Sequence, residues 1–305
     1  MEQTKYRYRL SRILVVRKTN FHLFGEKVKF ASVLLTALLL ASCVKDTLYD
    51  TPHSDKVAVT ISLTGLSADD NYVLDMDGKV ADITGSPFTN PDLLNPGTHS
   101  MVIYNRAEGF TFNGRMARVN APDGKSCADG ASVIPLPGYL KTVSQEITVT
   151  ADDTLRVSPV PQQRVRDLQL ELEVTQGRPE LIQSVTATLS GIAGIFDMEK
   201  GQTIGEPTST VFSFTREGSK LTADAHLLGT MGAVQTLVLD IVFTDGGRTQ
   251  HTEVDLTEAL ANFYGDMITV YRITGTLETL VGMEEGKGKI TGRETVEGGD
   301  ASAEM

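Results

Sequence analysis

Strict alternation of apolar and polar residues is the feature that most constrains this chain. From Leu168 to Val174, every second residue is Leu or Val, and the residues between them are Gln or Glu. Successive side chains of a β-strand point to opposite faces of its sheet, so this pattern predicts a strand that is buried on one face. The same alternation recurs at 57–63, 147–149 and 185–189, which predicts further strands of this kind.

Turn signals separate several of these predicted strands. Asp77-Gly78 lies between Tyr72–Met76 and Lys79–Ile83, and the run 245–247 (Asp-Gly-Gly) lies between 237–244 and 249–255. A short Asp-Gly element between two strand-like runs is typical of a β-hairpin. Residues 237–243 are apolar on both faces except for Asp240, which predicts a central strand.

Short strands with frequent turn signals indicate an all-β chain built from β-sandwiches, and the length suits two of them. We expect an N-terminal sandwich at 56–162 and a C-terminal sandwich at 163–278, divided at the Pro-containing segment 158–163. Residues 279–305 form an acidic, Gly-rich tail, in which a last strand is an open alternative. One short helix is predicted at 255–263, with Asp255 as N-cap and Leu256, Leu260 and Phe263 on one face.

The N-terminus has the organisation of an export signal. Eight Lys/Arg residues lie within 1–29, and the apolar run Phe30–Ala41 follows, ending at Ser42 and Cys43. This run is shorter than the roughly 20 residues that a membrane-spanning helix needs. Leu40-Ala41-Ser42-Cys43 resembles the bacterial lipobox, which predicts a lipoprotein signal peptide at 1–42, cleavage between Ser42 and Cys43, and a lipid on Cys43. An ordinary secretory signal with a chance cysteine is the alternative.

Cleavage there would leave a strongly acidic chain, beginning with a tether at 43–55. Of the 28 basic and 39 acidic residues, 20 and 37 would remain, a net charge of −17. Nucleic acids and anionic lipids are bound through clustered Lys and Arg, so a nucleic-acid partner is not expected. Cys127 would be the second cysteine beside the lipidated Cys43, which excludes a disulfide within the mature fold and a cysteine-based metal site.

No pattern in the sequence predicts an enzyme, a cofactor or a metal site. His53, His99, His226 and His251 are not paired at metal-ligand spacing, and no Gly-x-Ser-x-Gly motif is present. Asp75-Met-Asp-Gly78 begins like a calcium loop but lacks the later ligands, so a hairpin turn is the better interpretation. The Gly-Lys-Ser triplet at 124–126 lacks the earlier Gly of a phosphate-binding loop.

The sequence resembles the FimB/Mfa2 family of fimbrial anchor and minor-subunit lipoproteins of Bacteroidales. The likeness spans most of 43–277 and departs from the family at His99, where an aromatic residue is expected, and at Arg293, where relatives often have Trp. It is carried by four segments, which are 43–53 (CVKDTLYDTPH), 95–105 (NPGTHSMVIYN), 137–140 (PGYL) with 145–149 and 162–165, and 187–194 (ATLSGIAG) with Asp197-Met198.

This resemblance implies two tandem transthyretin-like β-sandwich domains and a lipid anchor in the cell outer membrane. It also implies that fimbrial stalk or pilin subunits are the partners and that they are engaged by β-strand addition. The residues that the family would use are the lipidated Cys43, the first strand with Val57, Val59, Ile61 and Leu63, and a terminal segment from about Ile268 and Val270 to Leu277. For both strands, a purely structural role in the core is the alternative.

Two other functions remain open at this point. A surface-exposed glycan-binding or adhesin lipoprotein is the first, although the chain has no Trp and is only 6% aromatic. The Lys45-Asp46 pair after the lipidated cysteine is similar to charged signals associated with surface display, and a solvated linker is the alternative. A lipid-anchored hydrolase is the second, but the sequence offers no set of nucleophile, base and orienting residue.

Overall fold

The computed structural model describes residues 55–64, 71–121, 133–244, 248–279 and 288–294. Ser42, Cys43 and the predicted tether up to residue 54 lie outside this part of the chain, as do the Gly-Lys-Ser triplet and most of the predicted tail. Within it, every regular element is a β-strand except the 3-10 turn Pro179–Leu181. The predicted all-β class is therefore confirmed.

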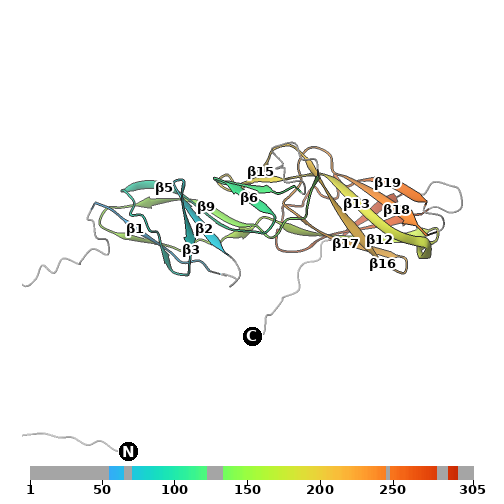
Figure 1. Ribbon diagram of the computed structural model, residues 1–305, viewed down its shortest axis with the longest axis horizontal. Coiled ribbons are helices and arrows are strands. Elements are labelled where there is room, and N and C mark those ends of the chain that lie inside the picture. The colour runs from blue at the N-terminus through green and yellow to red at the C-terminus, as the bar shows by residue number, and fades with distance from the viewer. Residues whose placement is uncertain (1–54, 65–70, 122–132, 245–247, 280–287, 295–305) are drawn as a thin grey trace, which may run out of the picture. The chain divides into compact units, whose positions relative to one another are not determined.

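Two sheets enclose the first hydrophobic core. Side chains from both sheets enter it, among them Ile61, Leu74, Met101 and Ile147, so the two sheets pack as a sandwich. Figure 1 shows β2, β3, β5 and β9 beside one another. The five-stranded sheet has the order β11-β9-β5-β2-β3 and the three-stranded sheet the order β10-β1-β4. Their strands are β1 (Ala58–Ile61), β2 (Tyr72–Met76), β3 (Lys79–Ile83), β4 (Phe88–Thr89), β5 (Gly97–Asn105), β9 (Lys141–Val149), β10 (Thr154–Val157) and β11 (Gln162–Gln163).

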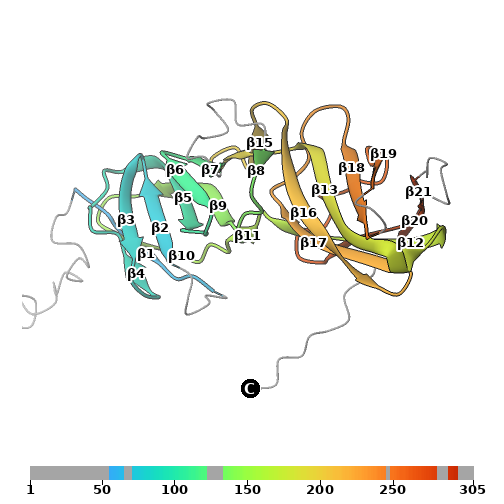
Figure 2. The same ribbon diagram turned by 45° about the vertical axis from the view of Figure 1, so that its right-hand side comes forward.

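A nine-stranded sheet encloses most of the second core. Its main path is β19-β18-β13-β16-β17-β12-β20-β21, and β8 pairs with β16 off that path. Figure 2 shows β12, β13, β16 and β17 side by side. The strands are β8 (Val133–Ile134), β12 (Arg166–Gln176), β13 (Ile182–Ile192), β16 (Thr208–Glu217), β17 (Lys220–Leu227), β18 (Thr236–Phe243), β19 (Thr249–Asp255), β20 (Tyr271–Glu278) and β21 (Gly288–Glu294).

The alternating segments form the strands that their period predicted. In β12, Leu168, Leu170, Leu172 and Val174 are all buried, while the Gln and Glu residues between them are more exposed. β18 pairs with β13 on one side and β19 on the other, as expected for a central strand. Its burial alternates, however, so only one of its apolar faces lies in the core.

A small sheet joins parts of the chain on either side of the predicted boundary at 162–163. Its order is β15-β14-β7-β6, and β7 pairs with β14 in antiparallel register. The bounds are β6 (Phe110–Asn113), β7 (Met116–Val119), β14 (Ile195–Asp197) and β15 (Gln202–Ile204). Backbone hydrogen bonds of this sheet therefore cross the predicted boundary. The position of the domain boundary stays a prediction.

The Asp77-Gly78 hairpin forms as predicted. β2 and β3 pair directly, with Tyr72 opposite Ile83 and Met76 opposite Lys79. Both turn residues have positive φ angles, 52° at Asp77 and 84° at Gly78. Two consecutive positive values are the signature of a type I′ turn, whose twist suits a two-residue hairpin.

The predicted helix at 255–263 is wrong. The segment folds as irregular turns, in which the Leu260 amide bonds to the Leu256 carbonyl but most helical bonds do not form. Leu256, Leu260 and Phe263 are nevertheless buried, so the periodicity correctly identified the core residues. The buried Arg166 contacts the end of this segment and the chain after it, since its Nε donates to Thr269 O at 2.7 Å and its Nη1 to Phe263 O at 2.5 Å. These bonds tie the end of the segment to β12.

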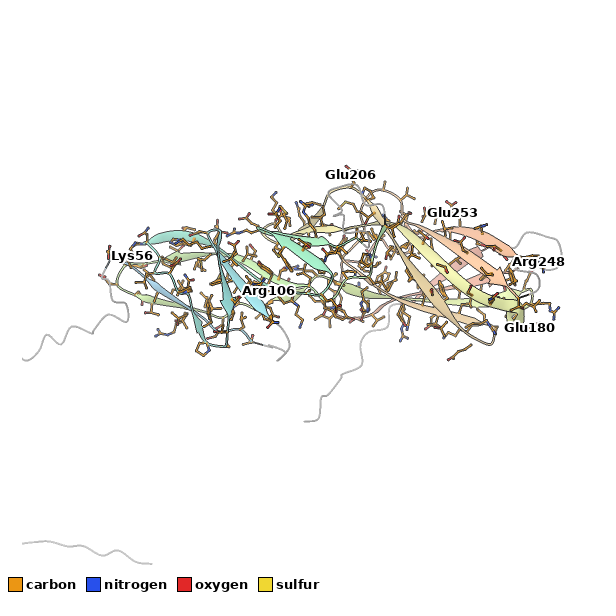
Figure 3. All side chains as sticks on the ribbon, viewed as in Figure 1. Lys56, Arg106, Glu180, Glu206, Arg248 and Glu253 are labelled. Carbon is orange, nitrogen blue, oxygen red and sulfur yellow. The ribbon has the colours of Figure 1, made fainter. Side chains whose placement is uncertain are left out.

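Charged side chains cover the outer faces of the sheets. Arg106, Glu180, Glu206 and Glu253, labelled in Figure 3, are exposed; Glu253 lies in β19, Glu180 in the 3-10 turn, and the other two in loops. Within the described residues, no helix is long and apolar enough to span a bilayer.

Candidate functional site

The first strand is the site that the sequence singled out, and two neighbouring strands complete it. β1 lies in the middle of its sheet, parallel to β10 and antiparallel to β4. Ala58 is opposite Thr154 and Ile61 is opposite Val157, whereas β4 contributes only Phe88 and Thr89. β1 therefore separates two short strands that do not pair with each other.

The alternating side chains of β1 and of the residues that flank it, Val57 and Leu63, fill the first core. Val57, Val59 and Ile61 are 0% exposed, and Leu63 is 6% exposed. They pack against side chains of β2, β5 and β9 in the facing sheet. Removing these four side chains from the core would uncover a continuous apolar strip along the path of β1.

Backbone hydrogen bonds satisfy both edges of β1. On one side, the Ser62 amide donates to Val157 O at 2.9 Å. On the other side, the Asn90 amide donates to Val59 O at 2.8 Å, and Val57 and Leu94 exchange two bonds of 2.9 Å. The strand therefore leaves neither edge open in this conformation.

Polar side chains fix the two ends of β1. Before the strand, Lys56 Nζ donates to Asn95 Oδ1 at 2.5 Å, and after it Ser86 Oγ donates to Leu63 O at 3.2 Å. The residues that complete this site, in β4 and β10, were not identified from the sequence. Phe88–Thr89 is too short to show a period, and Thr154–Val157 gave no strict alternation.

The C-terminal candidates do not lie in a strand. Ile268 is 80% exposed, and it and Val270 precede β20, which begins only at Tyr271. The expected strand start at Ile268 is therefore wrong. Asp266 explains the difference, since its carboxylate accepts bonds from the amides of Ile268 (2.9 Å) and Thr269 (3.3 Å) and holds a turn there. β20 itself is paired on both sides, with β12 and β21.

A buried ion pair near the first hairpin was missed at the sequence level. The Asp75 carboxylate accepts bonds from Arg115 Nε at 3.1 Å and Nη2 at 2.9 Å, and from the Gly78 amide at 2.8 Å. Arg115 Nη1 also contacts Glu199 in the β14–β15 turn, at 2.5 Å. The Asp75-Met-Asp-Gly78 segment is thus a hairpin turn with an arginine partner, and its first carboxylate is fully engaged.

A second polar cluster involves His226, one of the histidines that the sequence does not pair at metal-ligand spacing. Tyr139 Oη donates to Asp167 Oδ1 at 2.7 Å, and His226 Nε2 lies 3.6 Å from the same oxygen. Burial, and then the hydrogen bond and charge of Asp167, raise the pKa of Tyr139 to about 12. A tyrosine with this pKa stays protonated at neutral pH and acts as a donor, consistent with structural pairing. Among the described residues, no group of three or more His, Cys, Asp or Glu could hold a metal ion.

Comparison with known proteins gives matches in structure. No protein-family model matches the chain, and no curated protein matches it in sequence. A candidate adhesin from Bacteroides ovatus superposes with a TM-score of 0.56 at 17% identity, covering 82% of this chain and 97% of that one. The fimbrial anchor protein Mfa2 from Porphyromonas gingivalis superposes with a TM-score of 0.52 at 11% identity, covering 73% and 91%.

These two structures bear on the resemblance drawn from the sequence segments. They are aligned over nearly their whole length, and both share the all-β arrangement described above. At such low identity, the agreement concerns the fold. This chain therefore has the fold of the fimbrial anchor protein Mfa2, as its sequence segments predicted.

Proposed function

We propose that this protein is a non-enzymatic, lipid-anchored fimbrial anchor or accessory subunit that engages pilin subunits by β-strand addition. The lipid on Cys43 would hold it in the outer membrane at the cell surface. The fold shared with a protein named as a fimbrial anchor supports this proposal.

The filled groove of β1 is the observation that carries the proposal. In strand addition, a subunit offers an apolar groove and a partner supplies the missing strand through main-chain hydrogen bonds. Under this proposal the chain's own β1 takes the place of the missing strand, which its bonded edges and buried inward side chains support. A subunit whose groove is already occupied would not accept a neighbour there. Such a subunit suits the end of a fibre.

The other surfaces that could contact a pilin are edges and exposed loops. β3 is an edge strand whose exposed residues are the charged Lys79 and Asp82, of the kind that protects natural edges, and the apolar Val80, which is 57% exposed. The segment with Ile268 and Val270 remains a proposed contact because of the exposed Ile268 side chain. A donated segment needs apolar residues that are accessible before binding.

The anchor function is tested on protein from native membranes. The wild type and Cys43→Ala would be compared by mass spectrometry of the N-terminus and by capture with associated proteins. An acylated Cys43 and a co-purifying strand-rich pilin are expected for the wild type. The Cys43→Ala protein should be absent from the membrane fraction, and no pilin should be captured with it there. An acylated protein without pilin would contradict the fimbrial role, and an unmodified soluble wild type would contradict the anchor.

The closed groove is tested by removing β1. A protease recognition sequence placed between Thr64 and Asn71 would allow the segment that ends at Leu63 to be cut off. The cut protein should then bind a labelled peptide of residues 56–63, whereas the intact protein should not. A peptide with Asp at positions 59 and 61 is the matched control, because charged groups cannot enter the apolar core. Equal binding by intact protein would show that β1 does not close the groove.

A surface-exposed adhesin or glycan-binding lipoprotein is the second candidate. It is favoured by the fold shared with the candidate adhesin from Bacteroides ovatus. A glycan array with the purified full chain distinguishes the two. Reproducible binding without any pilin partner would replace the first proposal.

A further inference from the structure

A cavity of about 410 Å³ lies away from β1, beside the β14–β15 hairpin. This volume is within the range of pockets that hold small molecules. Four parts of the chain contribute to its wall: the segment between β11 and β12, the hairpin itself, Leu228 directly after β17, and the loop between β19 and β20. The lining side chains used below are Arg164, Phe196, Gln202, Thr203, Tyr264 and Met267.

Arg164 is the charged group of this cavity and has no acidic partner there. Its Nε donates to Thr142 Oγ1 at 2.8 Å and its Nη2 to Thr142 O at 3.4 Å. Its guanidinium lies over the Phe196 ring, 5.4 Å from the centroid. Among the described residues, no carboxylate lies within 4.0 Å of it, and Nη1 has no hydrogen-bond partner.

Among the described residues, Arg164 is half-buried and lacks a counter-ion, and in the second respect it differs from the arginines that form ion pairs. Arg115 pairs with two carboxylates, and even the exposed Arg106 and Arg178 each have one. Burial lowers the pKa of Arg164, so its surroundings disfavour the charge without compensating it. A buried charge is normally retained only when it is paired and hydrogen-bonded, which points to an anionic partner from outside.

Hydroxyl and amide groups line the same cavity. Thr203 Oγ1 lies 3.3 Å from Tyr264 Oη, and Tyr264 Oη donates to Thr230 O at 2.7 Å. Gln202 contributes an exposed amide. Tyr264 is 48% exposed, and it lines the cavity.

Gly229 holds the Tyr264 ring in this position. A Cβ at residue 229 would lie 2.2 Å from Tyr264 Oη, and the φ angle of Gly229 is +151°. Only glycine therefore lets the tyrosine lie so close to the backbone. Gly229 thus leaves room for the tyrosine, whose hydroxyl bonds to Thr230 O.

We infer that this cavity binds a small hydroxylated carboxylate of the acidic-sugar class, such as a uronic or sialic acid. Its carboxylate would pair with the free edge of the Arg164 guanidinium, whose planar donors match a carboxylate geometrically. Its hydroxyl groups would bond to Thr203 and Gln202, and its ring would rest on Tyr264. This site is independent of strand addition, since it shares no residue with β1, β4 or β10.

The test is calorimetric titration of the purified full chain with four probes. These are D-glucuronic acid, N-acetylneuraminic acid, the neutral match D-glucose, and acetate, which has the carboxylate without the ring. At least one of the two acidic sugars should bind with a millimolar dissociation constant, and glucose and acetate should bind at least tenfold more weakly. The acid that binds more tightly shows whether the cavity prefers a uronic or a sialic acid. Glucose binding as tightly as the acids, or no binding by either acid, would overturn the assignment.

Variants connect the binding to the named residues. Arg164→Gln should weaken acidic-sugar binding at least tenfold, and Arg178→Gln, which changes an exposed arginine elsewhere, should leave it unchanged. Thr203→Val removes one ligand hydroxyl contact from a half-buried position and should weaken the acidic sugars more than acetate. The Thr203→Val variant still tests the proposal if the Arg164→Gln variant does not fold. Unchanged binding in both site variants would overturn the proposal.

Discussion

Asp75 and Arg115 form an ion pair that is almost fully enclosed by the protein. The Asp75 side chain is 3% exposed and that of Arg115 is 14% exposed, and the guanidinium bonds to the same carboxylate oxygen through Nε and Nη2. The pair joins β2 to the β6–β7 turn, and through Glu199 to the β14–β15 turn. Segments that are far apart in the sequence are therefore held together by charge as well as by backbone pairing.

Breaking this pair should destabilise the protein strongly. Arg115→Met leaves the Asp75 carboxylate buried without its counter-ion, which typically costs about 3–5 kcal/mol. Urea denaturation gives the change in the free energy of unfolding. Arg106→Met is the control, because the Arg106–Asp82 pair is exposed and such pairs contribute about 0–1 kcal/mol. If Arg115→Met and Arg106→Met lowered the free energy of unfolding equally, burial of the Asp75–Arg115 pair would not be the cause of the effect.

Shortening the first strand's core side chains should also be costly. Ile61→Ala removes a fully buried side chain, and such truncations cost about 2–5 kcal/mol. Thr60→Ala changes the neighbouring residue, whose hydroxyl makes only an exposed 3.3 Å contact with Thr89, and should cost under about 1 kcal/mol. Thermal or chemical unfolding of the two variants measures the difference. A small effect of Ile61→Ala would mean that β1 is not an integral part of the sandwich.

The first hairpin should depend on glycine at its second turn position. Gly78→Ala places a Cβ at a φ angle of +84°, which costs about 1–2 kcal/mol for a non-glycine residue. No heavy atom would lie within 4 Å of that Cβ, so backbone strain is the only cost expected. Gly85→Ala also adds a Cβ in open space, and because its φ is not positive, it should be nearly neutral. The difference between the urea unfolding midpoints of Gly78→Ala and Gly85→Ala measures the cost of the positive φ angle at residue 78.

Stability should vary with pH through His99 and Asp77. Their side chains lie 2.5 Å apart, and His99 Nε2 lies 2.8 Å from Asn95 O. Burial alone would lower the pKa of His99, but the hydrogen bonds to Asp77 and Asn95 outweigh it and raise the pKa above the ordinary 6.5. Burial alone would raise the pKa of Asp77, but the bonds from His99 and Ser100 outweigh it and lower the pKa below the ordinary 3.8.

The signs of these two shifts define the pH window. The His99 contribution is complete below pH 6.5 and is lost as the pH rises through its raised pKa. The Asp77 contribution is present above pH 3.8 and is lost as the pH falls through its lowered pKa. The pair should thus stabilise most between these values, and His99→Gln should flatten the decline above pH 6.5. Unfolding midpoints of both proteins from pH 4 to 9 provide the test, and an unchanged slope in His99→Gln would contradict it.

The sequence by itself determined the all-β class, the first hairpin and most core positions. These depend on local rules: side chains alternate along a strand, and Asp-Gly tolerates positive φ angles. For this reason Leu168 to Val174 and the Asp77-Gly78 turn could be predicted from neighbouring residues alone. The buried residues of 255–263 were predicted correctly for the same reason, although their helix was not.

Only the tertiary structure decided which strands pair and which charges meet. Local pattern favours a helix at 255–263, whereas the segment folds as turns, and the buried Arg166 binds its last carbonyl, that of Phe263, from 97 residues away. The partners of β1 lie in β4 and β10, and Arg115 meets Asp75 from 40 residues away. Arg164 was not identified because a guanidinium without a counter-ion is recognisable only once its surroundings are known. Such pairings depend on distance in space, which no local period encodes.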